Sequence, residues 1–72
     1  MKEIFIYTDF VTLGQFLKLA NLIQTGGEAK EFLANHKIFV DGELDNRRGR
    51  KLYDGMIVAL LDEKFVIKKV WL

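Results

Sequence analysis

The apolar positions of this chain change their spacing along its length, and these changes divide it into predicted strands and helices. The short stretch Glu3–Tyr7 is rich in aromatic and β-branched residues, which favours a strand. From Val11 to Ile23 the apolar residues recur every three or four positions, which predicts a helix that buries Leu13, Phe16, Leu17, Ala20 and Ile23. The side of this helix opposite the buried face carries a stripe of small and polar residues, which either faces solvent or contacts a ligand: Gly14, Lys18, Asn21 and Thr25. Thr12 and Gln15 have the spacing of a capping box at the start of this helix.

A second helix is predicted directly after the first. The segment Thr25-Gly26-Gly27-Glu28 repeats the capping-box spacing, and the helix that follows should bury Ala29, Phe32 and Leu33. Asn35-His36 should end it, because both residues tolerate a left-handed backbone better than most. Since only a tight turn can join the two helices, we expect them to form a compact pair.

The segment after the helices is predicted to be β-rich. Ile38-Phe39-Val40 forms a short strand that runs into Asp41-Gly42, a favoured hairpin turn. We expect Phe39 in the core. Asn46–Lys51 follows as an irregular loop, and Asp54-Gly55 makes another turn.

Two further strands complete the pattern. Met56–Leu61 and Phe65–Trp71 are apolar and β-branched, and Asp62-Glu63-Lys64 joins them. No proline, repeat or low-complexity tract marks a linker. The order of strand, two helices and several strands predicts a single α+β domain over residues 1–72.

Composition limits what can stabilise this domain and where it works. The chain has 72 residues, half of them hydrophobic, and no Cys, so apolar packing must replace disulfides and thiolate metal sites. Its longest apolar run, Met56–Leu61, is far shorter than the ~20 residues of a membrane span. The N-terminal apolar stretch is too short for a signal peptide. We therefore expect a soluble cytoplasmic protein without a membrane partner.

The chain offers little catalytic chemistry. It contains no Ser and no Cys, and the single His36 cannot build a zinc site. Gly26-Gly27 lacks the spacing of a P-loop, although amides at a glycine-bearing helix start can bind a phosphate oxygen. We expect no enzyme activity, no metal and no cofactor.

Positive charge is concentrated in the loop Asn46–Lys51, whose sequence is NRRGRK. The formal net charge is only +1, and without the four cations of the loop 7 basic residues face 10 acidic ones. A run of charge is often only a solvated loop. Here the cations are mostly Arg, whose planar fork matches phosphate, and Gly49 lets the backbone come close to a partner. The loop therefore favours a polyanion ligand.

The order of these features resembles the S-four RNA-binding domain, which is named after the fourth small-subunit ribosomal protein. The matching pieces form a core motif at about residues 12–58: Leu13-Gly14-Gln15-Phe16-Leu17, Glu28–Asn35, Ile38-Phe39-Val40-Asp41-Gly42 and Asn46–Gly55. The chain is most similar to the small, free-standing, bacterial YaaA-like proteins of this family. The resemblance implies two short helices packed against a small, mostly antiparallel sheet, the alpha-L motif. It also implies a non-catalytic protein that binds structured RNA, ribosomal RNA in particular.

The resemblance further implies that the helical pair and the basic loop form one RNA-facing surface. The residues assigned to phosphates are Arg47, Arg48, Arg50 and Lys51, and the further RNA contacts are Gln15, Lys18, Asn21, Thr25, Lys30 and Asn46. Many family members carry Arg or Lys where this chain has Gly26-Gly27, so an anion there would depend on backbone amides, Lys18 and Lys30. Tyr53 could stack on a base, although an aromatic residue in this position is more often part of the core.

Other partners are consistent with the same residues. The basic loop could dock on an acidic, ribosome-associated protein, which would make this chain an interaction adaptor. It could also be an accessory domain detached from an RNA-modifying enzyme, and phosphate contacts alone do not separate RNA from DNA.

Overall fold

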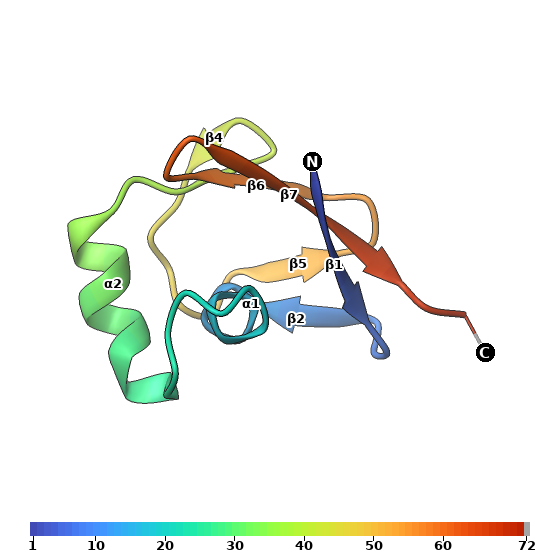
Figure 1. Ribbon diagram of the computed structural model, residues 1–72, viewed down its shortest axis with the longest axis horizontal. Helices are drawn as coiled ribbons and strands as arrows, with labels where there is room; N and C mark the ends of the chain where they lie inside the picture. Colours follow the sequence, from blue (N-terminus) through green and yellow to red (C-terminus); the bar gives the residue numbers. More distant parts are fainter. Residues whose placement is uncertain (72) are drawn as a thin grey trace.

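Two sheets and two α-helices make up the computed structural model, which describes residues 1–71 (Figure 1). The strands of the larger sheet, in their order across it, are β1 (Lys2–Ile6), β7 (Glu63–Lys69), β6 (Ile57–Leu60), β3 (Phe39–Val40) and β4 (Glu43–Leu44). The smaller sheet pairs β2 (Phe10–Thr12) with β5 (Lys51–Tyr53). Only the β1–β7 pair is parallel among the described residues. The predicted α+β fold with a mostly antiparallel sheet is confirmed.

The first helix, α1 (Leu13–Leu19), is shorter than predicted. Its capping box is confirmed, because the Thr12 N–H donates to Gln15 Oε1 at 2.8 Å and the Gln15 N–H donates to Thr12 Oγ1 at 3.2 Å. Val11 belongs to β2 instead of the helix, since it pairs with Leu52. The helix stops before Asn21, whose φ of 62° is left-handed. The pairing of β2 with β5 thus shortens the predicted helix at its start, and the turn at Asn21 shortens it at its end.

The second helix, α2 (Ala29–Asn35), follows a single 3-10 turn, η1 (Gly26–Glu28). The predicted capping box at Thr25 is wrong: its side chain makes no cap hydrogen bond, and Glu28 Oε2 accepts from the Gln24 N–H at 3.0 Å instead. The helix ends at Asn35 as predicted, but His36 is extended, with φ −134°. Its ring stacks on Phe32 with a centroid distance of 4.0 Å, which holds it without a left-handed turn.

The core lies between the larger sheet and the helices. In Figure 1, α1 runs beneath the sheet beside the β2–β5 pair, and α2 stands at one end. Phe16 of α1 meets Phe65 of β7 edge-to-face, with ring centroids 5.3 Å apart. Phe39 was expected in this core, but it is 38% exposed while Ile38 and Val40 are buried. Alternation along the strand explains this outcome, because adjacent side chains point to opposite faces.

The tight turns are largely where the sequence puts them. Asp41 and Gly42 both have positive φ, which suits the predicted hairpin between β3 and β4. Gly55 also has a positive φ, in the second predicted turn. The β6–β7 turn differs, because Leu61 and Asp62 adopt the left-handed conformation and Glu63 already belongs to β7. Within residues 1–71, no helix is long and apolar enough to cross a membrane.

Candidate nucleic-acid interface

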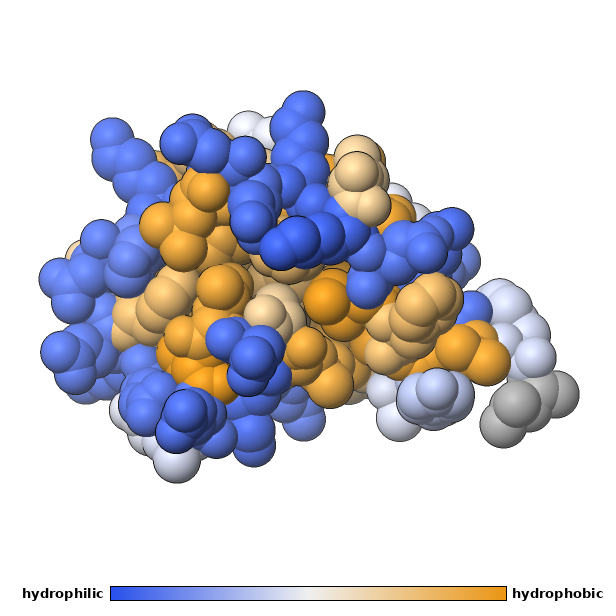
Figure 2. Space-filling view, in the orientation of Figure 1, coloured by the Kyte–Doolittle hydropathy of each residue, from blue (hydrophilic) through white to orange (hydrophobic). Residues whose placement is uncertain are grey.

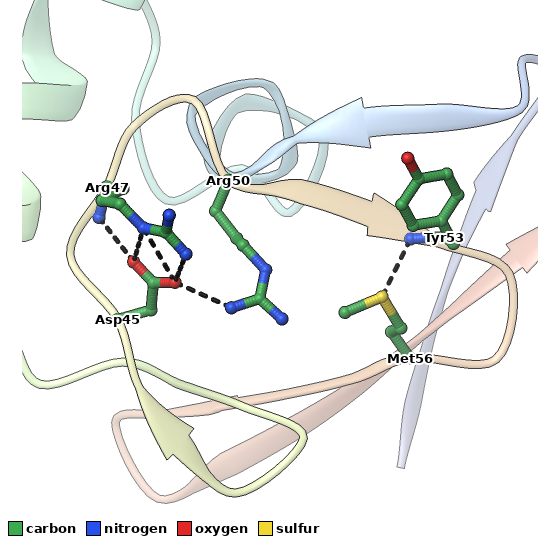
Figure 3. A network of polar contacts seen from close by, with 5 residues as sticks. All are labelled: Asp45, Arg47, Arg50, Tyr53 and Met56. Atoms are coloured by element: carbon green, nitrogen blue, oxygen red, sulfur yellow. Dashed lines mark hydrogen bonds and ion pairs between the residues drawn. The ribbon is translucent and has the colours of Figure 1, made fainter.

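A nearly buried carboxylate organises the basic loop. Asp45 is only 8% exposed, and Arg47 forms a two-pronged ion pair with it, from Nε to Oδ1 at 3.1 Å and from Nη2 to Oδ2 at 2.8 Å (Figure 3). The Arg47 N–H also donates to Oδ1 at 2.9 Å, and Arg50 Nη1 donates to Oδ2 at 2.8 Å. The hydrogen bonds from Arg47 hold the pKa of the Asp45 carboxyl well below its usual value, although burial opposes this shift.

The sequence reasoning missed Asp45. The available signal was an acidic residue two positions before an Arg, because an Asp side chain commonly accepts from the N–H two residues later in an Asx turn. The consequence for the loop is electrostatic as well as structural. Two of the four loop cations, Arg47 and Arg50, pair with this one carboxylate. The four cations and Asp45 together carry a formal charge of +3. The predicted phosphate contacts are therefore not four equivalent free cations.

The loop cations differ in exposure. The Arg47 side chain is 69% exposed and presents the outer edge of its guanidinium to solvent, whereas that of Arg50 is only 24% exposed. Lys51 Nζ lies 4.9 Å from the centre of the Phe10 ring, a cation–π contact. Arg48 is exposed and makes no ion pair within the part of the chain that the structure describes.

The main chain of the loop is fastened to the start of α1. The Leu13 N–H donates to the Arg50 carbonyl at 2.8 Å, and the Gly14 N–H donates to the Arg48 carbonyl at 2.9 Å. Gly14 is buried by this contact, and a Cβ there would lie 2.9 Å from Arg48 Cγ. The close packing of the loop thus explains why the predicted polar stripe has a glycine at position 14. The first amides of α1, which a helix leaves without internal partners, bind loop carbonyls.

Two hollows lie on either side of the loop. One, of about 310 Å³, separates the loop from the helices and is lined by Thr12, Gly14, Gln15, Lys18, Gly26, Ala29, Arg48 and Gly49. The other, of about 570 Å³, is lined by Arg47, Gly49, Arg50, Lys51, Tyr53 and Met56. Gly49 borders both. The structure therefore brings Gln15 and Lys18 together with Arg48 in one hollow, and places the other three loop cations in the second.

The remaining predicted contacts line neither hollow. Asn21 follows α1 in the left-handed turn, Thr25 precedes η1 in an extended conformation, and Lys30 lies on α2. Asn46 lies at the beginning of the loop. All four are exposed. The structure therefore does not place these four residues in the walls of either hollow.

The outward face of the small sheet carries an aromatic pair. Tyr53 and Phe10 are cross-strand partners whose ring centroids lie 5.7 Å apart, while Leu52 between Lys51 and Tyr53 points inward and is fully buried. Tyr53 is 46% exposed, so it lies on the surface rather than in the core. It therefore places an aromatic ring directly beside the cationic loop.

Apolar surface adjoins this basic region. A third hollow, of about 870 Å³, is lined by Thr8, Asp9, Phe10, Val11, Gln15, Lys18 and Leu19. It shares Gln15 and Lys18 with the hollow between the loop and the helices. Figure 2 shows apolar side chains gathered in the middle of one face of the molecule, with hydrophilic ones around them. Charged and apolar surfaces thus meet at the exposed side of α1.

Comparison with known proteins relates this chain to one family. A protein-family model described as the S4 domain matches residues 4–68. A protein of Bacillus subtilis (strain 168) named "Probable ribosome maturation protein RlbA" is 60% identical over 55 residues. The aligned region covers 76% of this chain and 78% of that protein. The expected likeness to small, free-standing proteins of the S-four type is confirmed.

Proposed function

Because this chain belongs to the S4 domain family, we propose that it binds structured RNA as a non-catalytic protein, and that this RNA is ribosomal. The observation that carries the proposal is the attachment of the basic loop to α1 through the Gly14 and Leu13 amides. This attachment makes the cations of the loop and the polar side of the helix one surface. The name of the Bacillus relative supports a role in ribosome maturation, which would place the work of the protein in the cytoplasm.

The surface suits recognition of RNA shape. Arg48 and Lys18 border one hollow and Arg47 and Lys51 the other, so phosphates on both sides of Gly49 can meet a cation. A structured RNA holds its phosphates and 2′-hydroxyls at fixed positions, and a loop fixed by Asp45 can match such positions without reading bases. Since the rest of the chain has more acidic than basic residues, attraction is confined to this side.

The salt dependence of binding tests the proposal. For a labelled RNA hairpin, log affinity should fall with log salt concentration at a slope of about −2 to −3, because about three to four cations displace counterions. The double variant Arg48→Gln/Lys51→Gln should bind more weakly and lower the magnitude of this slope by about 1.5. Neither residue makes an ion pair among residues 1–71, so the fold should survive.

A matched control removes two cations elsewhere. Lys37 and Lys64 line a separate hollow that shares no residue with the two beside the loop. The variant Lys37→Gln/Lys64→Gln has the same net charge as the test variant and should keep most of the affinity and the slope. Equal losses in the two double variants, or a slope near zero for the unchanged protein, would contradict a localised RNA surface.

A second candidate function is an adaptor that docks on an acidic, ribosome-associated protein. The apolar hollow of about 870 Å³ beside Lys18 favours this idea, since the sugar–phosphate backbone of RNA has no apolar side chain to fill it. Capture of partners from a lysate with and without nuclease separates the two functions. Partners retained after nuclease treatment support the adaptor, and their loss supports RNA binding.

A further inference from the structure

An exposed aromatic ring lies among the cations of the larger hollow beside the loop. Tyr53 lines this hollow together with Arg47, Arg50 and Lys51. In Figure 3, Arg47 and Arg50 turn toward Asp45, while Tyr53 stands apart on β5. The fold does not bury Tyr53, which is 46% exposed, and it gives the hydroxyl no hydrogen-bond partner among the described residues. Its role in the core is therefore small.

Tyr53 offers a better stacking surface than its neighbour Phe10. The Phe10 ring is already in contact with Lys51 Nζ, 4.9 Å from its centre, and is itself only partly exposed. Phe10 also packs against Tyr53 with an angle of 50° between the rings, so it supports Tyr53 from the neighbouring strand. This cross-strand contact fixes the position of the Tyr53 ring on the outward face of the sheet.

The hollow beside Tyr53 has the size and charge for one nucleotide. Its volume of about 570 Å³ lies within the range of small-ligand sites, about 300–1,000 Å³. Gly49 leaves its rim open, because a Cβ at that position would meet nothing within 4 Å. Aromatic rings beside Arg and Lys are the arrangement by which proteins bind unpaired bases, the ring stacking on the base and the cations contacting its phosphates.

We propose that Tyr53 stacks on one unpaired RNA base, while Arg47 and Lys51 contact the phosphates that flank it. This inference rests on the proposed RNA binding and adds the feature that the RNA must display. Inside a fully paired helix, neighbouring base pairs cover both faces of every base, so the preferred RNA has an unpaired nucleotide next to a helical segment. The cations bind the backbone of either kind of RNA, whereas Tyr53 distinguishes between them.

The test compares two labelled RNAs, a fully paired duplex and the same duplex with one unpaired adenosine. The unchanged protein should bind the bulged RNA more tightly. Tyr53→Leu should reduce affinity for the bulged RNA by about 5- to 140-fold, the effect of losing one stacked base, and leave affinity for the duplex unchanged. Tyr53→Phe keeps the ring and should retain the preference. Tyr7→Leu is the matched control, because Tyr7 is 70% exposed and lines neither hollow beside the loop.

The outcomes separate this inference from the proposed function. Salt-dependent binding of both RNAs with no preference for the bulge, or an equal effect of Tyr53→Leu on both, overturns the stacking role and leaves RNA binding intact. Failure of the unchanged protein to bind either RNA overturns both. Ultraviolet crosslinking to the bulged RNA followed by mass spectrometry gives a second measurement. The adduct should form on Tyr53, and an adduct confined to other residues contradicts the proposal.

Discussion

The Gly14 N–H donates to the Arg48 carbonyl at 2.9 Å, and a Cβ on Gly14 would lie only 2.9 Å from Arg48 Cγ. Gly14 is the second residue of α1, and Arg48 lies in the middle of the basic loop. In the sequence, the rest of α1, η1, α2 and the β3–β4 hairpin separate the two residues that this contact joins. The helix start and the loop therefore hold a fixed relative position.

Gly14→Ala should alter this position with little effect on stability. Ala is better than Gly inside a helix by about 1 kcal/mol, which offsets the displacement of Arg48 Cγ from a Cβ only 2.9 Å away. We expect the free energy of unfolding in urea to change by less than about 1 kcal/mol, while RNA affinity falls a few-fold. In an Arg48→Ala background the same change should no longer affect affinity, and an equal loss in both backgrounds would contradict this coupling.

Asp45→Asn should destabilise the protein. It removes the charge that pairs with Arg47 and Arg50 at a nearly buried position, and the loss of such charge-assisted bonds typically costs about 1–3 kcal/mol. Urea denaturation measures this loss. Asp62→Asn is the control, because it makes the same charge change at an exposed left-handed position that Asn tolerates. Similar losses in both variants would show that Asp45 has no special role.

Acid should remove the contribution of Asp45. Its folded-state pKa is depressed by Arg47, so the ion pair stabilises the fold above the ordinary Asp value of 3.8. Below that value the unfolded chain gains a proton that the folded state resists, and stability falls as pH drops toward the depressed pKa. The stability difference between the unchanged protein and Asp45→Asn should therefore narrow below about pH 4. Urea denaturation at a series of pH values measures it.

The matched variant for the acid series is Asp9→Asn. Asp9 pairs with Lys69, which also lowers its pKa, but its side chain is 83% exposed and the pair is screened by water. Its removal should change the pH dependence of stability little. A difference between the unchanged protein and Asp45→Asn that stays constant from neutral to acidic pH would show that the carboxylate is not what stabilises the loop.

Gly49→Ala should separate RNA binding from folding. A Cβ at Gly49 would meet nothing within 4 Å, and its φ lies outside the left-handed region, so Ala is tolerated and the stability should stay equal or rise by up to about 1 kcal/mol. Because Gly49 borders both hollows beside the loop, the added methyl group should weaken RNA binding. Gly27→Ala, which also has room for a Cβ but lines neither hollow, should bind RNA normally. Equal affinity of both variants would exclude a close approach at Gly49.

Local signals in the sequence were enough for much of the fold. The capping box of Thr12 and Gln15, the Asp41-Gly42 turn and the end of α2 at Asn35 depend on neighbouring residues, and the structure confirms them. Pairings between segments that are distant in the sequence were harder to predict from these local signals. Val11 joins a strand because Leu52 lies opposite it, and no local pattern specifies that partner. Tertiary context here overrides helical periodicity.

The candidate site shows the same division. Composition was enough to identify the basic loop as a candidate site, but it did not indicate which of the four cations would be exposed. Arg47 and Arg50 both pair with Asp45, yet the Arg47 side chain is 69% exposed and the Arg50 side chain only 24% exposed. The sequence left two roles open for Tyr53, a surface that stacks on a base or a residue of the core. Tyr53 lies outward because alternation along β5 directs Leu52 to the core instead.

The ion pairs of Asp45 also bear on the thermodynamics of association. Fixing the backbone of one residue costs about 1–2 kcal/mol in conformational entropy, and a mobile loop would lose that freedom when RNA binds. Here the carboxylate and the amides of α1 already fix the loop in the free protein. Association should then depend little on ordering the protein, and an RNA whose phosphates do not match the preset shape gains nothing from loop rearrangement. Rigidity would act as a source of selectivity in a protein that reads no base sequence through its cations.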